Sequence, residues 1–420
     1  MDFTPTEAQA AARELAAEIF EDLSTPERLR ALDGDTDAEL WKGLCAAGLV
    51  AAVEETGLLG LALMLEEQGR RTAQVPFAAT CVYGLLPIGA YGTSEQRARW
   101  LPALRAGTAV ATGAFPPPGR GPAVTASPAV RGPSRDAAAV TSAGAGEDDQ
   151  EGEGGGGDWR LSGVVPVVPW LREATHVLVP ARCATDGVVR CFLVETARTG
   201  VRVVPVETTA PWSAGRLALE DVSGEVLGEG APSGPHVPHS SYDEAYRPTL
   251  DRARTGFAAL QAGVCAGSLA RAVEHTCERE QFGRPLSTHQ GVQLRAADAH
   301  MDTEAIRVTV YEAAWRHDQG LPAHTHSLTA AWWAADAGRR VVHAGQHLHG
   351  GIGADLDHPV HRHFLWGRQL DACLGSPGAL LAELGEALAA PEEEVPSVLK
   401  EGVPSVPPED AGRSVAPEDL

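Results

Sequence analysis

Three long helical segments follow one another in the second half of the chain, and they limit the possible folds more than any other feature. Each segment is long enough to span a domain, and together they cover residues 249–280, 289–319 and 322–347. The first carries apolar residues at helical spacing, among them Leu260 and Val264. Long helices with apolar stripes and short connections pack as a bundle, so we predict a four-helix bundle over residues 240–390.

Two parts of different character precede this bundle. Residues 1–112 have helical periodicity, and the segment Thr4–Glu7 predicts the start of the first helix, with Thr4 as its cap. Residues 113–235 contain short valine-rich runs, such as 159–170, separated by Gly, Pro and Asp, which predicts several short strands. The expected fold is therefore α+β, with an N-terminal helical domain, a middle small β domain and a C-terminal four-helix bundle.

Two segments have a composition that does not favour packing. Residues 116–157 are rich in Pro, Gly, Ala and Ser, and residues 391–420 are rich in Pro and acids. Such segments bury too little apolar surface to offset the entropy that is lost when a chain is ordered. We therefore expect a low-complexity insertion at 116–157 within the β domain and a disordered acidic tail at 391–420.

The charge and the cysteines exclude some classes of partner and site. With 56 acidic and 34 basic residues, the formal net charge is −22, which disfavours binding to nucleic acid and to anionic membranes. The first residues include acids and no basic segment, unlike a secretory signal, and no uncharged apolar stretch of about 18 residues predicts a membrane span. The seven cysteines are scattered without a Cys-x-x-Cys pair, which suits a reducing cytoplasm and disfavours a thiolate metal site. We expect a cytoplasmic protein that binds no metal.

Two short motifs in the bundle segment are more specific. The first reads Arg279-Glu280-Gln281-Phe282-Gly283-Arg284-Pro285-Leu286 and continues to Thr288-His289-Gln290-Gly291. The second, one long helix downstream, reads His347-Leu348-His349-Gly350-Gly351-Ile352-Gly353. The first motif resembles the R-x-x-F-G signature of the acyl-CoA dehydrogenase family, with its later Gln. The second is similar to that family's Q-x-x-G-G-x-G turn, with His347 in place of the Gln. The resemblance extends from the start of the chain to about Leu388, apart from the insertion.

The resemblance implies a binding role for both motifs. Members of the family bind FAD across a subunit interface, where one protomer holds the pyrophosphate and adenosine of its neighbour's cofactor. The residues at the matching positions are Arg279, Phe282, His289, Gln290, His347, Gly350 and Gly351. Arg suits a diphosphate because its planar fork offers charged, directional donors. Adjacent glycines let the main chain approach a phosphate closely.

The residues that carry out the family's chemistry are missing. Family members abstract an α-proton from an acyl thioester with a glutamate that occupies one of two positions. By resemblance, these two positions hold Leu374 and Ala253. Asp251 is a weak candidate for a base, because it lies two residues before Arg254 and points to another side of the helix. The chain is thus expected to have no catalytic residue of its own.

The motifs that hold the flavin ring have also changed. The family's Trp-Ile-Thr, which packs on the isoalloxazine, aligns with Val167-Val168-Pro169. A valine cannot stack as a tryptophan does, and a proline has no N–H to donate. Trp170 lies close to this motif and is expected to be a core residue instead.

These losses favour a heteromer, because a symmetric homo-oligomer would contain only incomplete sites. The chain resembles the non-catalytic subunit of heterotetrameric (α2β2) acyl-CoA dehydrogenases, in which the partner supplies the flavin pocket and the glutamate. This implies FAD as cofactor, an acyl-CoA or acyl-carrier thioester as substrate, and no activity for the chain alone. The partner is then a catalytic subunit of the same family, or a second copy of this chain. The alternatives are a flavin-dependent monooxygenase, a carrier-protein-linked acyl desaturase, and a non-enzymatic structural homologue.

Overall fold

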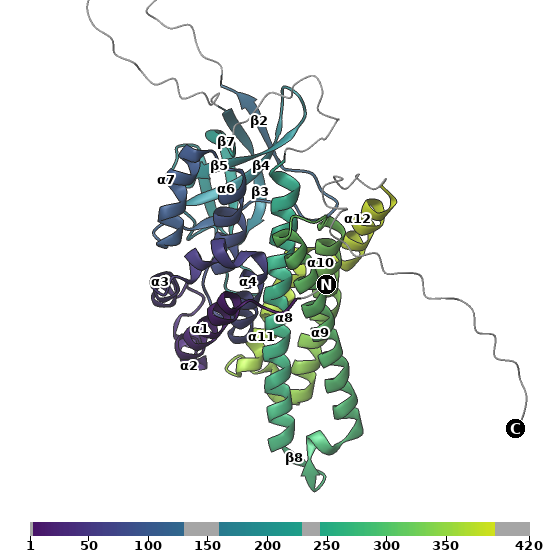
Figure 1. Cartoon of the computed structure of the whole chain (residues 1–420). Coiled ribbons are helices and arrows are strands. Elements are labelled where there is room, and N and C mark those ends of the chain that lie inside the picture. The colour runs from purple at the N-terminus through teal and green to yellow at the C-terminus, as the bar shows by residue number, and fades with distance from the viewer. Residues whose placement is uncertain (1–2, 130–158, 229–243, 391–420) are drawn as a thin grey trace, which may run out of the picture.

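The computed structural model describes residues 3–129, 159–228 and 244–390 and arranges them in three packed parts (Figure 1). The first part is helical, and its elements are α1 (Glu7–Leu23), α2 (Pro26–Ala31), α3 (Ala38–Ala46), α4 (Leu49–Arg71), α5 (Phe77–Thr80), the π-helical turn η1 (Cys81–Leu85), α6 (Leu86–Tyr91) and α7 (Ser94–Arg105). The tail 391–420 and most of the expected insertion lie outside the described residues.

The first helix begins later than the sequence predicts. Thr6, not Thr4, caps α1: Gln9 N–H donates to the Thr6 hydroxyl, and the Gln9 side chain accepts from Thr6 N–H at 3.0 Å. The Gln9 side chain also donates to the carbonyl of Thr56 at 2.8 Å. This tertiary contact with α4 fixes the capping box at Thr6 and Gln9, although the pair Thr4 and Glu7 has the same spacing.

The middle part is a small β domain whose strands close into a ring. Its strands are β1 (Ala111–Gly113), β2 (Val124–Pro128), β3 (Trp159–Val168), β4 (His176–Cys183), β5 (Val189–Glu195), β6 (Val201–Pro205) and β7 (Gly215–Val226). The order is β1-β4-β2-β3-β7-β5, and a further pairing of β5 with β4 closes a ring of β4, β2, β3, β7 and β5, with β1 attached to β4 outside it. Strand β6 pairs with β7 outside the ring.

The prediction for residues 116–157 was wrong at one end of the segment. Strand β2 lies inside the expected insertion and pairs antiparallel with β3 and parallel with β4. Its inward residues Val124 and Ala126 are buried in the β-domain core. The strand is held by partners that are distant in sequence, so local composition gives no sign of it.

The third part is the predicted bundle, with one helix beyond the four. It contains α8 (Tyr246–Glu278), α9 (Gln290–Asp318), α10 (His324–His349), α11 (Pro359–Leu374) and α12 (Pro377–Ala389). The short hairpin strands β8 (Glu280–Gln281) and β9 (Arg284–Pro285) and a 3-10 turn η2 (Leu286–Thr288) connect α8 to α9, and a 3-10 turn η3 (Gly350–Ala354) follows α10. The α+β architecture expected from the sequence is confirmed.

Helix α8 is the central helix of the bundle. It packs against α4 so closely that a Cβ on Gly263 would lie 2.0 Å from the carbonyl oxygen of Glu66. Among the described residues, α8 is the one unbroken helix that is long and apolar enough to cross a membrane by length and composition. Since 72% of its apolar window is buried inside the fold, this apolar surface belongs to the core.

Candidate functional site

The first predicted motif forms a hairpin that projects from the end of the bundle (Figure 1). Arg279 ends α8, and its carbonyl accepts from Leu286 N–H at 2.9 Å, which closes the base of the hairpin. The two-residue turn between β8 and β9 consists of Phe282 and Gly283, with φ of 57° and 79°. Positive φ at both positions matches the twist of a tight hairpin but is unfavourable for a bulky residue such as phenylalanine. Phe282 is 84% exposed, and the one ring contact that the described structure gives it is with His289, edge-on at 6.1 Å.

His289 offers a hydrogen-bond donor that has no acceptor among the residues that the structure describes. Its Nδ1 lies 3.2 Å from an Nη of Arg284, which can only donate, so Nδ1 accepts and the proton of the neutral ring is on Nε2. Nε2 is buried without a hydrogen-bond partner. A buried donor without a partner costs free energy, and a ligand oxygen would satisfy it.

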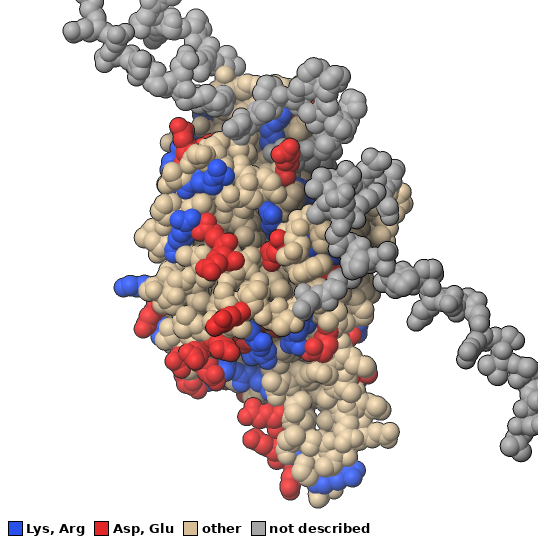
Figure 2. Space-filling model, in the orientation of Figure 1, with Lys and Arg blue, Asp and Glu red and all other residues tan. Residues whose placement is uncertain are grey.

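Arg279 and Gln290 also have unused polar groups. Both side chains are exposed, and neither makes an ion pair or a side-chain hydrogen bond with the residues that the structure describes. Figure 2 shows basic side chains at this projecting tip, with acidic side chains along one edge and uncharged surface over the rest of the visible face. A free guanidinium beside an unpartnered imidazole N–H favours an anion with several oxygens, such as a phosphate.

The second motif forms an open turn at the end of α10. Gly350 has φ of 65° and ψ of −140°, and its N–H donates to the carbonyl of His347. No atom lies within 4 Å of a Cβ built on Gly350 or on Gly351, so the main chain of this turn is open to a ligand. The His347 side chain is exposed beside the turn.

Both motifs lie at the same end of the bundle. The ring of His275, one turn before Arg279, stacks on the ring of His349, which directly precedes Gly350. The structure therefore brings two groups of predicted residues to one end, and they form the candidate half-site: Arg279, Phe282, His289, Gln290, His347, Gly350 and Gly351. Their chemistry fits the pyrophosphate and adenosine of a dinucleotide: a free cation, an unpartnered N–H, an exposed aromatic ring and an open glycine turn.

The two positions for a catalytic base lie at the other end of α8 and are apolar. Leu374, at the end of α11, is 3% exposed, and Ala253 is buried within α8. At about 1.5 Å per residue, Ala253 and Arg279 are roughly 39 Å apart along the helix. An extended dinucleotide does not span this length. The candidate half-site therefore faces away from this chain's own base positions.

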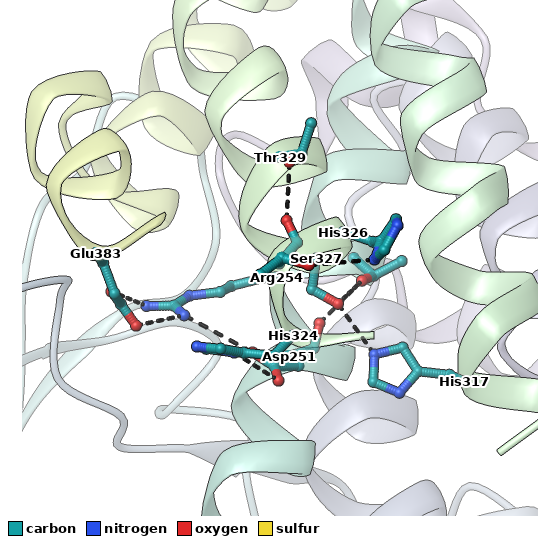
Figure 3. A network of polar contacts seen from close by, with 10 residues as sticks. Asp251, Arg254, His317, His324, His326, Ser327, Thr329 and Glu383 are labelled. Carbon is teal, nitrogen blue, oxygen red and sulfur yellow. Dashed lines mark hydrogen bonds and ion pairs between the residues drawn. The ribbon is translucent and has the colours of Figure 1, made fainter. Parts of the chain in front are cut away.

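Asp251 belongs to a polar network instead of serving as a base (Figure 3). Both of its carboxylate oxygens lie 3.0 Å from Nδ1 of His324, and one lies 3.8 Å from Arg254. Arg254 in turn donates to both oxygens of Glu383, at 2.9 and 2.7 Å. Glu383 is a carboxylate near the lost base positions that the sequence did not single out, but its bidentate pairing with Arg254 neutralises it.

The same network contains Ser327 beside His317. Burial keeps this serine away from any substrate. Nε2 of His317 lies 3.0 Å from Oγ of Ser327, which lies 3.1 Å from the hydroxyl of Thr255. Ser327 is fully buried inside the bundle. Burial lowers the pKa of His317 to about 4, so its ring is neutral near pH 7. This group connects helices and has no path to a substrate.

Aromatic side chains fill the junction between the β domain and the bundle. The aromatic cluster contains Tyr83, Phe115, Trp170, Trp212, Tyr246, Phe257 and Trp366, and it is connected by ring contacts of 4.5–6.1 Å. Trp170, Trp212 and Trp366 are among the largest fully buried side chains, as expected for Trp170. The indole N–H groups of Trp212 and Trp366 have no hydrogen-bond partner.

The cluster is next to the segment Val167–Pro169, which aligns with the family's flavin-ring motif, and near the base position Ala253. Trp170 directly follows Pro169, and the carbonyl of Pro169 accepts from the Thr112 hydroxyl at 2.6 Å. Phe115 follows the segment that begins at Thr112, and Phe257 lies one turn after Ala253 on α8. Sequence reasoning missed the cluster, because its members are scattered over almost 300 positions and no spacing connects them.

No metal centre is found within residues 3–129, 159–228 and 244–390, where no group of three or more His, Cys, Asp or Glu side chains could hold an ion.

Comparisons with known proteins show what the chain as a whole is similar to. Residues 6–108 match the family model described as the N-terminal domain of acyl-CoA dehydrogenase, and residues 244–388 match the C-terminal domain. The chain is 31% identical over 408 residues to acyl-CoA dehydrogenase FadE27 of Mycobacterium tuberculosis, covering 93% of this chain and 99% of that protein. It is similar in structure to a variant of the Tcur3481–Tcur3483 steroid ACAD (38% identity, TM-score 0.77, 91% and 98% covered). It is also similar to the ChsE4–ChsE5 complex of M. tuberculosis (30% identity, TM-score 0.78, 94% and 100% covered).

Proposed function

The chain belongs to the acyl-CoA dehydrogenase family, and from this premise we propose that it is the non-catalytic subunit of a heteromeric, FAD-dependent member. In this proposal it contributes the pyrophosphate and adenosine half of a shared FAD site. A catalytic subunit of the same family supplies the flavin pocket and the glutamate. The complex then desaturates an acyl thioester between its α and β carbons.

One observation carries the proposal: binding groups at one end of α8 are unused, while buried aromatic rings pack the junction near the other end. Arg279 and the Nε2 of His289 have no partner in the described chain. The aromatic cluster, by contrast, packs the junction around Trp212 with buried rings. A chain that bound a flavin only for itself would need the second region open, and it would not need an exposed half-site.

The work of this chain is binding and orientation. FAD, when bound, supplies the acceptor for the hydride that leaves the substrate. Arg279 offers two directional N–H groups and a positive charge to a diphosphate, and His289 offers its Nε2–H. Gly350 and Gly351 let the main chain approach without a side chain in the way. With Leu374 and Ala253 at the base positions, this chain takes no proton from the substrate.

The relatives support the type of partner and substrate. The solved structures named Tcur3481–Tcur3483 and ChsE4–ChsE5 each carry two protein names, and the first is called a steroid ACAD. We therefore extend the proposal to a bulky, steroid-like acyl thioester as the substrate of the complex. A flavin monooxygenase made of this chain alone is disfavoured, because Val167-Val168-Pro169 replaces the motif that would pack on its flavin ring.

The test is FAD binding to a complex of this chain with a co-expressed family member that carries the glutamate. Arg279→Ala removes a charge-assisted contact worth about 1.5–3 kcal/mol, so FAD affinity is expected to fall about ten- to a hundredfold. Arg279→Lys restores only part of it, because the planar fork is lost. Excess FAD restores turnover, since the partner's base is untouched.

The matched control is Arg97→Ala on α7, which removes an exposed arginine that also makes no ion pair among the described residues. It is expected to leave FAD affinity unchanged. Unchanged affinity in Arg279→Ala, or one FAD per protomer with full turnover in the lone chain, would overturn the proposal.

A further inference from the structure

Three imidazole rings lie packed together beneath the candidate half-site. The ring of His349 stacks on that of His275, with centroids 4.8 Å apart and planes 20° from parallel. The ring of His358 meets His349 edge-on at 4.9 Å. His349 is buried, and the other two are partly buried. These three residues form the histidine stack.

The histidine stack joins the two motifs of the half-site. His275 lies four residues before Arg279, and Arg279 N–H donates to its carbonyl at 2.9 Å, so both residues follow one face of α8. His349 is the last residue of α10 and directly precedes Gly350. His358 is the N-cap of α11, at the far end of the segment that starts with the glycine turn. The ring contacts therefore set the separation between Arg279 and the turn.

The hydrogen bonds of the stack define the proton on Nδ1 of His349 and require a neutral ring at His358. His349 Nδ1 lies 2.7 Å from the carbonyl of Gly345, so this nitrogen carries the proton. His358 Nδ1 accepts from Val360 N–H at 3.2 Å, so this nitrogen is unprotonated. A second proton on His358 would occupy that nitrogen and remove the cap of α11.

Most of the charges around the stack disfavour protonation of its rings. Arg271 and His275 face the stack from α8, and Asp355 faces it from the turn after α10. Burial lowers the pKa of His349, and neighbouring His275, His358 and Arg271 lower it further, although its bond to Gly345 opposes this. Burial and Arg271 also lower the pKa of His358, against the effect of Asp355. Protonation would place new positive charge beside Arg271, and the stack would separate.

We propose that the histidine stack is a positioning device that holds the glycine turn at the correct distance from Arg279, and that it makes dinucleotide affinity depend on pH. This inference rests on the proposed function, since it concerns the same half-site. The stacked state presents both motifs to one diphosphate. Separation of the rings lets the turn move away from α8 and weakens binding.

The test compares His275→Ala with His275→Phe, because the His275 side chain stacks on His349 and makes no hydrogen bond or ion pair with the residues that the structure describes. In the complex at pH 8, His275→Ala is expected to weaken FAD binding about two- to tenfold, the value of one aromatic pair. His275→Phe keeps a ring and restores affinity. Below pH 6.5, affinity is expected to fall less steeply in His358→Asn, which keeps a side-chain acceptor for the cap of α11 but takes up no proton, than in the natural chain. His289 is present in both, so its own titration does not produce the difference.

A second measurement needs no cofactor. In the isolated chain, amide hydrogen exchange at Gly350–Ala354 is expected to be faster in His275→Ala and unchanged in His275→Phe and in the control His300→Ala, an exposed histidine of α9. If Arg279→Ala weakens FAD binding but both His275 variants behave like the natural chain, the stack has no positioning role and only this inference fails. If Arg279→Ala has no effect, the proposed function fails first.

Discussion

The indole rings of Trp170 and Trp212 lie stacked, with centroids 4.5 Å apart and planes 17° from parallel. The backbone N–H of Trp170 donates to the carbonyl of Trp212 at 2.8 Å, so the two β-domain segments are bonded as well as stacked. Trp366 of α11 meets Trp212 edge-on, and Phe257 of α8 is stacked on Trp212 with ring centroids 6.1 Å apart. These rings attach the β domain to the bundle at the place where the family's flavin motif has been lost.

We expect Trp212→Ala to destabilise the chain by about 3–5 kcal/mol, because it opens a large cavity in a rigid junction. The control Trp332→Ala removes a half-buried ring on α10 and should cost clearly less. Urea unfolding of both variants measures the difference. The cavity should not create flavin binding in the lone chain, because no new hydrogen-bond donor replaces Pro169. A loss of under 1 kcal/mol would mean that the junction is not held by this ring.

Replacing the lost base should not restore catalysis. Leu374 is packed in the core, and the following Gly375 has φ of 103° and lies against Pro118. Leu374→Glu buries a carboxylate without an ion-pair partner, and this lowers the free energy of unfolding by several kcal/mol, as an order of magnitude. The control Leu374→Met conserves volume and should cost under about 1.5 kcal/mol. We expect acyl-CoA oxidation by the lone Leu374→Glu chain to stay at background, and measurable turnover would show that the flavin-ring region is open after all.

Two neighbouring residues of strand β2 test whether this strand is part of the β domain. Val124 points into the β-domain core, and its neighbour Thr125 points to solvent. Val124→Asp places a charge among apolar side chains and is expected to cost several kcal/mol, on the order seen for unpaired buried charges. Thr125→Asp should stay within about 1 kcal/mol, since it loses only the hydroxyl bond to the Ser162 carbonyl. Equal melting temperatures for the two variants would mean that residues 124–128 do not pack in the β domain and belong to the expected insertion.

The sequence predicted features that depend on local pattern and missed features that depend on distant partners. The order of the three parts and the long helices follow from periodicity, which the chain carries along each element. Strand β2 exists only because β3 and β4 border it, and the segment around it has the composition of a loop. The aromatic cluster is similar: Phe115, Trp170 and Trp366 meet only after all three parts have packed.

The candidate half-site also combines features that follow from local sequence with features that depend on distant partners. Arg279 and the glycine turn follow from motifs, because their spacing in the sequence is fixed by the function that they share in the family. The unpartnered Nε2 of His289 depends on the position of Arg284, which is known only from the hairpin's geometry. The histidine stack unites residues from α8, α10 and the cap of α11, so a sequence scan sees only separate histidines. Whether these residues bind FAD stays a prediction.

Acid should destabilise the bundle through His317. Burial lowers its pKa to about 4 in the folded chain, whereas an unfolded histidine titrates near 6.5. Between these two values the unfolded state binds more protons, so the free energy of unfolding falls as the pH is lowered through this window. The full contribution is roughly 3 kcal/mol, and none of it is lost above about pH 7.

The variant His317→Gln keeps a polar group near Ser327 but takes up no proton. Its free energy of unfolding is expected to fall less steeply between pH 6.5 and 4 than that of the natural chain, while both respond alike above pH 7. Urea unfolding at a series of pH values measures both slopes, and His300→Gln on the exposed face of α9 is the control. If the two slopes are equal, the proton that destabilises the fold is taken up elsewhere. The next group to test would be His363, whose pKa burial also lowers to about 4.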